Sequence, residues 1–439
     1  MKKIILYFIT ALCINISSVY AGDAGNVEID IPTAVDMAFG NSEDIKINRE
    51  SLKKLDNIYR EVRASVFPQV TGALGVNRFI ESPVMKVDLG EGEVSIPMAS
   101  DWESSIDLKV SQVLWAFGKV MNVIRLAENY INLEKHSADI TRNELTYAVK
   151  QVYYSMLLAD DIAKIATESH KNALKNKDAL KGRYSGGRIS NINNIKMEAD
   201  ISGRVPSMLQ AEQSYELVEV TMRDILGVPE ENDIVLTEKF ITVFSEFDYD
   251  NLRSSMLSRE PVLMVYREKL NLADTKIRLK KSSFYPTLSG FMSYSYGGGD
   301  DKIIPDDMNS ELVAGVMLNY DIWDSGKRKN SYRQAENDRN IAEFDYRKME
   351  RALDVELKSA ITEYRALIKI YDANRRAVKL AGEAYEIALS SFKSGAVSQT
   401  MLNDAELQLT GAKMRERTTL YNINIVIAMI EKLTAENRR

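Results

Sequence analysis

The sequence repeats itself at a fixed offset of 208 residues, and this duplication constrains the fold more than any other feature. Residues 114–119 read LWAFGK, and residues 322–327 read IWDSGK. The offset then holds without a gap for more than a hundred positions, so that Gly187 corresponds to Gly395 and Glu198 to Glu406. A repeat of this length predicts two copies of one structural unit, and it outweighs local propensities.

The first 21 residues predict a secretory signal peptide. Lys2 and Lys3 precede a mostly apolar stretch at 4–16, and residues 19–21 (VYA) supply a small-residue cleavage site. A retained membrane anchor is the alternative, but the apolar core is short and no stop-transfer flank follows. The only cysteine, Cys13, follows Leu12, where a lipid-anchored signal needs a small residue. We therefore expect a mature protein without lipid anchor, disulfide or thiolate chemistry.

The composition excludes several classes of function. Removal of the signal with its two lysines takes the net charge from −6 to −8. This acidic balance argues against nucleic-acid binding, which needs a basic face. No later run of about 18 apolar residues predicts a transmembrane helix. The only histidines, His136 and His170, face different directions on one predicted helix, so they do not predict a shared metal site. Without a P-loop, GxSxG or HExxH motif, we expect no enzyme and no cofactor.

Proline ends a predicted helix in both copies. A helix at 44–66 stops before Pro68, and one at 259–284 stops before Pro286, since the residue preceding proline avoids helical geometry. Beyond each proline the apolar spacing changes from 3.6 to 2, which indicates strands. The expected strands lie at about 69–80, 103–115, 287–297 and 311–323. Loops rich in Gly, Pro and acidic residues, at 82–101 and 297–310, join them.

The expected strands carry apolar residues on one face and polar residues on the other. Apolar positions include Val70, Leu74, Val76, Ile106, Leu108, Val110, Leu114, Leu288, Met292, Tyr294, Tyr296, Leu312, Ala314, Val316, Leu318, Tyr320 and Ile322. This alternation is typical of membrane strands, which need about 9–11 residues per crossing. A half-buried sheet in a soluble domain gives the same pattern. The export signal, the tyrosines, and Trp115 and Trp323 at equivalent strand ends favour the membrane, because aromatic residues gather at its interface.

Two very long helices are predicted at about 119–181 and 327–390. Every seventh residue of the first is apolar: Ile124, Ile131, Ala138, Leu145, Val152, Ala159, Ala166, Ala173 and Leu180. Such heptads indicate coiled-coil packing, and a second apolar stripe beside the first suits a ring of helices. At 1.5 Å per residue, about 63 residues give a rod of about 95 Å. That length is about three bilayer cores, so the rod must project into an aqueous compartment.

Each long helix ends in a turn with glycine, which is a helix C-cap signal. Returning helices follow at about 190–227 and 398–435. A short acidic connector, 229–246, separates the two structural repeats at 22–228 and 247–439. Four strands cannot close a membrane barrel, whose smallest form has about eight, and open edges are not tolerated in lipid. Several chains must therefore share one barrel.

In this order of elements the chain resembles the outer-membrane efflux protein (TolC-like) family. The residues that carry the resemblance are the helix–strand breaks Pro68 and Pro286, the strand–helix corners with Trp115, Gly118, Trp323 and Gly326, and the tip segments 183–190 and 391–398, with Ala405 and Glu406 just beyond. The resemblance covers nearly all of the mature chain. It implies a mainly α protein with a transmembrane β part, in which a homotrimer forms a 12-stranded outer-membrane β-barrel on a periplasmic α-helical barrel.

The resemblance also implies partners. Family members are passive exit ducts that dock onto a periplasmic adaptor and an inner-membrane pump, which is driven by protons or by ATP. The adaptor is expected to contact the helix tips, at Gly187, Ser190, Gly395 and Ser398. A purely geometric role of the two glycines in the turns is compatible with that contact. Besides these proteins and outer-membrane lipid, we expect no nucleic acid partner.

The resemblance further implies a gate at the tips. The expected gate residues are Asp404, Met401, Asn193, Phe392 and Tyr184. Asp404 matches one acidic position of the family pattern, whereas Met401 and Asn193 stand where others are expected, and Val397 replaces a basic latch residue. Three Asp404 carboxylates in a trimer would form a ring that attracts cations, and like charges held close raise one another's pKa. A solvated face of the returning helix is the alternative for Asp404.

The sequence leaves the cargo open. Small-molecule efflux, including multidrug resistance or metal export, competes with type I protein secretion, because the pump selects the cargo. Outside this class, a structural coiled-coil protein of the periplasm or cell surface is the alternative. That alternative predicts no membrane strands, so fractionation with the outer membrane separates the two.

Overall fold

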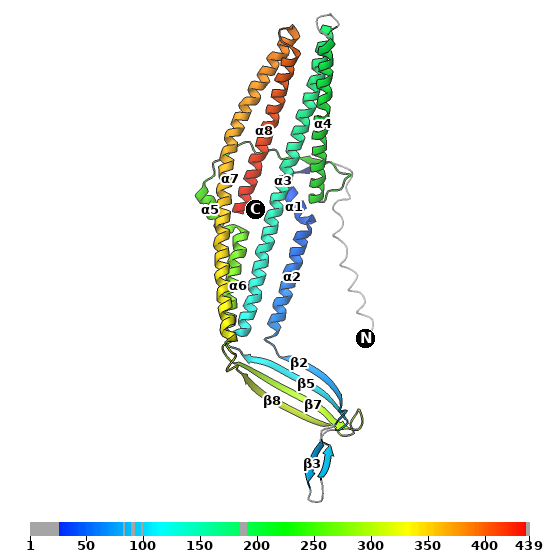
Figure 1. Ribbon diagram of the computed structural model, residues 1–439, viewed down its shortest axis with the longest axis vertical. Coiled ribbons are helices and arrows are strands. Elements are labelled where there is room, and N and C mark those ends of the chain that lie inside the picture. Colours follow the sequence, from blue (N-terminus) through cyan, green and yellow to red (C-terminus); the bar gives the residue numbers. More distant parts are fainter. Residues whose placement is uncertain (1–25, 82–83, 89–92, 98–99, 185–190, 436–439) are drawn as a thin grey trace, which may run out of the picture. The chain divides into compact units, whose positions relative to one another are not determined.

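The computed structural model describes residues 26–81, 84–88, 93–97, 100–184 and 191–435 (Figure 1). The expected signal peptide and the tip residues Gly187 and Ser190 lie outside these ranges. The chain is mainly helical, and it divides into two compact units. The first unit takes residues up to 46, 140–260 and 352 onwards, and the second takes 47–139 and 261–351. Each unit therefore draws on both sequence copies.

One four-stranded antiparallel sheet forms the β part of the second unit. Its strands, in spatial order, are β2 (Gln69–Arg78), β5 (Trp102–Trp115), β7 (Thr287–Asp300) and β8 (Asn309–Asn319). Pro68 and Pro286 each stand directly before the first residue of a strand, where the missing N–H costs no helical hydrogen bond. The two strands of each copy are neighbours, and β5 pairs with β7 to join the copies.

Two details of this sheet differ from the sequence-based expectation. The segment 82–101 contains a hairpin of β3 (Val84–Asp88) and β4 (Glu93–Pro97), where only a loop was expected, because its β-branched residues outweigh its Gly and acidic content. The last strand ends at Asn319, so Trp323 lies beyond the strand and not at its end. The carbonyl of Asp321 instead accepts a hydrogen bond from Arg328, at 2.6 Å, in the turn that follows.

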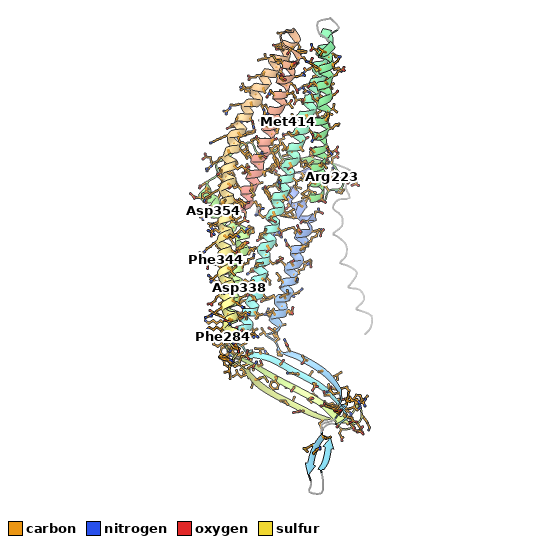
Figure 2. All side chains as sticks on the ribbon, viewed as in Figure 1. Arg223, Phe284, Asp338, Phe344, Asp354 and Met414 are labelled. Carbon is orange, nitrogen blue, oxygen red and sulfur yellow. The ribbon has the colours of Figure 1, made fainter. Side chains whose placement is uncertain are left out.

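Helices pack beside one another in the same unit. They are most of α2 (Glu43–Ala64), α6 (Pro261–Ser282) and the first parts of α3 (Lys119–Tyr184) and α7 (Lys327–Ser394). Asn129 of α3 donates to the Thr275 hydroxyl of α6 at 2.8 Å. Phe284, just after α6, meets Tyr332 of α7 edge to face, with ring centroids 6.2 Å apart (Figure 2). Both long helices are thus fixed against α6.

The other unit contains α1 (Ile31–Asn41), the later parts of α3 and α7, α4 (Asn191–Leu226), α5 (Tyr249–Arg259) and α8 (Gln399–Thr434). In Figure 1, α4 runs beside α3, and α8 runs beside α7. The connector holds structure that was not expected from the sequence: β6 (Ile234–Leu236) pairs in parallel with β1 (Val27–Ile29). This pairing ties the start of the described chain to the segment between the two copies.

Tyr153 of α3 is the centre of the apolar core beneath this small sheet. Its ring is fully buried, and its hydroxyl donates to the Ile29 carbonyl at 3.0 Å and accepts from the Glu238 amide at 2.9 Å. Burial raises the pKa of the Tyr153 hydroxyl to about 12, so it stays neutral and holds both strands. Asn424 of α8 is also fully buried. It fixes the segment that follows β6, because its side-chain oxygen accepts a hydrogen bond from the Ile241 amide at 2.9 Å.

The heptad positions face the interior as their spacing predicts. Of the nine apolar residues from Ile124 to Leu180, the eight whose burial the structure describes are all buried or half-buried. The equivalent Leu353, Ala360 and Ala388 of α7 are buried as well. The seven-residue period therefore marks the packed side of both long helices.

Candidate functional site

The sheet has one strongly exposed apolar face. Register aligns apolar residues across neighbouring strands in ladders, such as Val70, Val110, Met292 and Ala314. Leu74 on this face is 81% exposed, whereas side chains of this type are usually buried in soluble proteins. A contiguous apolar face of this kind marks a surface that contacts lipid or another protein.

The opposite face is polar. Asp107 of β5 lies at its centre, where its carboxylate accepts from Ser295 of β7 at 2.6 Å and from Ser105 at 2.9 Å. Register places Ala73 and Ser295 directly beside Asp107 on the neighbouring strands. Small and polar residues on this side, together with the apolar face, give the alternation of a membrane strand.

Both edges of the sheet are unpaired within the described residues of this chain. β2 pairs only with β5, and β8 pairs only with β7. Each edge leaves a row of backbone N–H and C=O groups without a partner strand, which is a template for pairing with another chain. The sheet is therefore an incomplete structure as a single copy.

The two strand–helix corners have the same backbone geometry. Phe117 and Gly118 have φ of 47° and 82°, and Ser325 and Gly326 have φ of 54° and 84°. These are left-handed conformations that glycine adopts without steric cost. The first helical amide after each corner closes the turn, since Lys119 donates to the Ala116 carbonyl at 2.9 Å. The repeated sequence motif is thus a repeated turn.

The second corner also carries an ion pair that the first cannot form. The Asp324 carboxylate accepts from the Gly326 amide at 3.0 Å and from the Arg328 guanidinium at 2.6 Å. Burial pushes the pKa of Asp324 up, but the hydrogen bonds from Arg328 and Gly326 outweigh it and hold that pKa below its usual value. Ala116 stands at the equivalent position of the first corner, where aromatic residues pack instead.

Glycine and serine shape the tip between α7 and α8. Gly395, with φ of 91°, ends α7: its amide donates to the Phe392 carbonyl, and the Ala396 amide donates to the Ser391 carbonyl at 2.8 Å. This is the Schellman arrangement of a helix C-terminus. Ser398 then caps α8 by accepting from the Met401 amide at 3.3 Å. Both expected adaptor-contact residues of this tip therefore have defined backbone roles.

The expected gate residues divide into buried and exposed groups. Phe392 is only 2% exposed and packs with Met197, Tyr385 and Leu402, so it holds the tip together from inside the chain. Whether it also takes part in a gate stays a prediction. The exposed or half-exposed group contains Asp404, Met401 and Asn193. Tyr184 is the last residue of α3, and its side chain lies outside the described part.

Sequence reasoning missed a buried ionic cluster behind this tip. Arg204 of α4 donates to the carboxylate of Glu406 on α8, to the Ser169 hydroxyl of α3 at 2.7 Å, and to Asp200 at 3.1 Å. Glu406 is 1% exposed, and Thr410 donates to its second oxygen at 3.1 Å. The repeat already singled out Glu406 as the counterpart of Glu198. The sequence does not show that the two residues differ in burial. In the structure, Glu198 is exposed and pairs with Lys177, whereas Glu406 is buried.

No described helix combines the length and the apolar character that a membrane-spanning helix needs. Among the same residues, no group of three or more His, Cys, Asp or Glu side chains is placed to hold a metal ion.

Comparison with known proteins links the second copy to one family. A model of the family described as outer membrane efflux protein matches residues 252–435, which covers most of the second copy. The chain thus resembles the outer membrane efflux protein family, and the match lies in its second copy. That family consists of outer-membrane channel proteins rather than enzymes, and the two relatives described next are outer-membrane proteins as well.

The individual proteins that this chain is similar to are distant. The pyoverdine export outer membrane protein OpmQ of Pseudomonas putida is 17% identical over 409 residues, which is 92% of this chain and 85% of OpmQ. The probable outer membrane lipoprotein SilC of Salmonella typhimurium is 22% identical over 405 residues, or 87% of this chain and 80% of SilC. The solved structure of CusC superposes with a TM-score of 0.77 at 16% identity and covers 92% of this chain and 91% of CusC. The fold is therefore shared over almost the full length.

Proposed function

We propose that this protein is the outer-membrane exit duct of a tripartite export system. The observation that carries the proposal is the four-stranded sheet, which has an exposed apolar face and two unpaired edges. Open edges are not tolerated in lipid, so sister copies complete the sheet. Three copies supply twelve strands, which suits the even-numbered barrels of the outer membrane. The helices of the three copies then continue the conduit into the periplasm.

The polar face of the sheet lines the inside of this barrel. Asp107, Ser105 and Ser295 lie on that face, whereas the ladders of Val, Leu, Met and Tyr lie on the other. A barrel with apolar residues outside and polar residues inside holds a water-filled channel. Solutes then pass without entering lipid, and the chain itself supplies no energy.

The helix tips form the docking and gating end. We assign the adaptor contact to the turn segments that include Gly187, Ser190, Gly395 and Ser398, because these end the paired helices. Asp404 is exposed just beyond the second tip, and three copies of it form an acidic ring in the trimer. Cations are then preferred at the narrow end. An inner-membrane pump, acting through the adaptor, supplies the driving force.

Small-molecule efflux is favoured over type I protein secretion as the duct's task. OpmQ is named for pyoverdine export, which is the export of a small molecule, and it aligns with 92% of this chain. Type I secretion remains the second candidate, since the duct places few constraints on cargo. Deleting the gene and measuring sensitivity to small toxic compounds and metals, alongside the set of secreted proteins, separates the two.

Cysteine crosslinking tests the shared barrel. The only cysteine lies in the expected signal peptide, so a pair of introduced cysteines reports without background. One cysteine replaces Ala73 on the β2 edge, and the partner is moved along β8 through Val313, Gly315 and Met317. We expect one register to give a disulfide-linked trimer on a denaturing gel. Only intrachain products in every register contradict the proposal.

A further inference from the structure

A cationic groove lies where the first strand–helix corner meets the end of α6. Three cations, Arg125, Arg278 and Lys281, line it together with two aromatic rings, Phe117 and Tyr285. The two rings stack with centroids 5.2 Å apart. No Asp or Glu side chain of the described residues lines this groove. Its charge is therefore that of an anion-binding site.

The three cations are available to a ligand. Each side chain is exposed, and none of them forms an ion pair with a carboxylate in the described part of the chain. Arg278 donates to the Thr275 hydroxyl at 2.7 Å, which orients its guanidinium without neutralising it. Arg339 of α7, by contrast, is paired with Asp274 of α6 and with Glu343.

The groove continues onto the apolar face of the sheet. A bulge after Val113 brings Trp115 into register with Leu288, and Leu288 is in register with Leu318. Trp115 therefore joins the apolar ladders, and its ring meets Phe117 edge to face at 6.0 Å. An anion in the groove thus lies beside a surface that accepts acyl chains. Figure 2 labels Phe284, one residue before Tyr285, at this junction of helices and strands.

The positions that correspond to the three cations in the internal repeat are also positively charged. The offset of 208 residues that aligns the corners places Arg333 at the position of Arg125. The offset of 218 that aligns Pro286 with Pro68 places Arg60 at the position of Arg278, and Arg63 at that of Lys281. Phe67 likewise replaces Tyr285 with another aromatic residue. The repeat therefore keeps the three charges and one of the two aromatic rings, because Ser325 stands at the position of Phe117.

We propose that this groove binds the headgroup phosphate of an anionic phospholipid in the periplasmic leaflet of the outer membrane. The inference rests on the proposed placement of the sheet in that membrane. Arg and Lys near a membrane surface attract anionic headgroups, and aromatic rings anchor at the same depth. Free phosphate shares the charge but gains nothing from the apolar side of the groove. The lipid, which satisfies both halves of the site, is therefore the occupant.

Native mass spectrometry of the full-length protein in neutral detergent tests this site. The probes are phosphatidylglycerol and the zwitterionic phosphatidylethanolamine with identical acyl chains. The groove variant carries Arg125→Gln, Arg278→Gln and Lys281→Gln. A control variant removes the same charge at three exposed lysines of α3, with Lys164→Gln, Lys171→Gln and Lys175→Gln. Inorganic phosphate is added as a competitor in a separate arm.

We expect the wild type to bind phosphatidylglycerol on the order of tenfold more tightly than phosphatidylethanolamine, the control variant to keep this preference, and the groove variant to lose it. Equal binding of both lipids by the wild type overturns the inference, as does an unchanged preference in the groove variant. Millimolar phosphate that displaces the lipid at the same phosphate concentration from the wild type and from the control variant shows a simple phosphate site. That result also overturns the inference. Conductance of the same preparation in a neutral bilayer tests the duct separately, so the two failures are distinguishable.

Discussion

Arg204 of α4 and Glu406 of α8 form an ion pair that is almost completely buried, and it connects the returning helices of the two sequence copies. Ser169 of α3 and Asp200 of α4 also contact the guanidinium. Buried charges are costly unless every one of them is paired and hydrogen-bonded. This cluster therefore fixes one arrangement of three helices just behind the expected gate.

Removal of one partner should destabilise this end of the protein strongly. In Glu406→Gln, the carboxylate charge that faces Arg204 is lost, and we expect a cost of roughly 3 kcal/mol. Thermal unfolding of the purified protein, followed by circular dichroism, measures the effect. The double variant Arg204→Met with Glu406→Leu removes both charges and should recover most of the loss. A double variant as unstable as Glu406→Gln would contradict the pairing.

The two corner glycines should be equally sensitive to substitution. An added Cβ at Gly118 or Gly326 meets nothing closer than an asparagine amide at 3.8 Å, so the penalty is purely conformational. We expect Gly118→Ala and Gly326→Ala each to cost about 1 kcal/mol, because an L-residue is strained at positive φ. Gly40→Ala in α1, also without contacts, is the control and should be neutral or stabilising by up to about 1 kcal/mol. Denaturant unfolding midpoints compare the three, and a large difference between the two corners would show that they are not equivalent turns.

Asp354 should make the stability of the folded protein depend on pH in the acid range. It accepts from Lys358 at 2.8 Å, from Tyr249 at 2.5 Å and from Arg253 at 3.0 Å, and these bonds lower its pKa to about 2 (Figure 2). Because the pKa of Asp354 is lower in the folded than in the unfolded state, its ionised carboxylate stabilises the fold. This contribution to the free energy of unfolding is fully present above about pH 4 and is lost as the pH falls toward about 2. The melting temperature of Asp354→Asn should therefore be lower than wild type at pH 6, and the gap should narrow between about pH 4 and pH 2. A gap that stays constant with pH would rule out this role.

Asp404 should set ion preference if its three copies form a ring. In Asp404→Asn, we expect the single-channel reversal potential in a salt gradient to move toward non-selective behaviour, because the carboxylates no longer attract cations. Asp250→Asn removes an exposed carboxylate from the short helix α5 and serves as the matched control. An unchanged cation preference in Asp404→Asn would place this residue on a solvated helix face.

The duplicated and periodic features of the chain could be predicted from sequence because they depend on local geometry. The corner glycines, the prolines before the strands and the heptad stripe all act through neighbouring backbone. Burial of Glu406 and the pairing of β1 with β6 could not be predicted, since they depend on contacts between segments about 200 residues apart. The resemblance implied Phe392 as a gate residue, but its burial could not be predicted, because it depends on the packing of α4 against α7 and α8. The early end of β8 before Trp323 reflects the turn around Arg328, whose donors bind both Asp321 and Asp324.

The molecular mass of the detergent-extracted protein, measured together with its conductance in planar bilayers, tests the shared barrel most directly. We expect a trimer that resists dissociation without heating and that opens a stable, water-filled channel in lipid. A monomer that conducts no current would show that the two open edges of the sheet are not completed by sister chains.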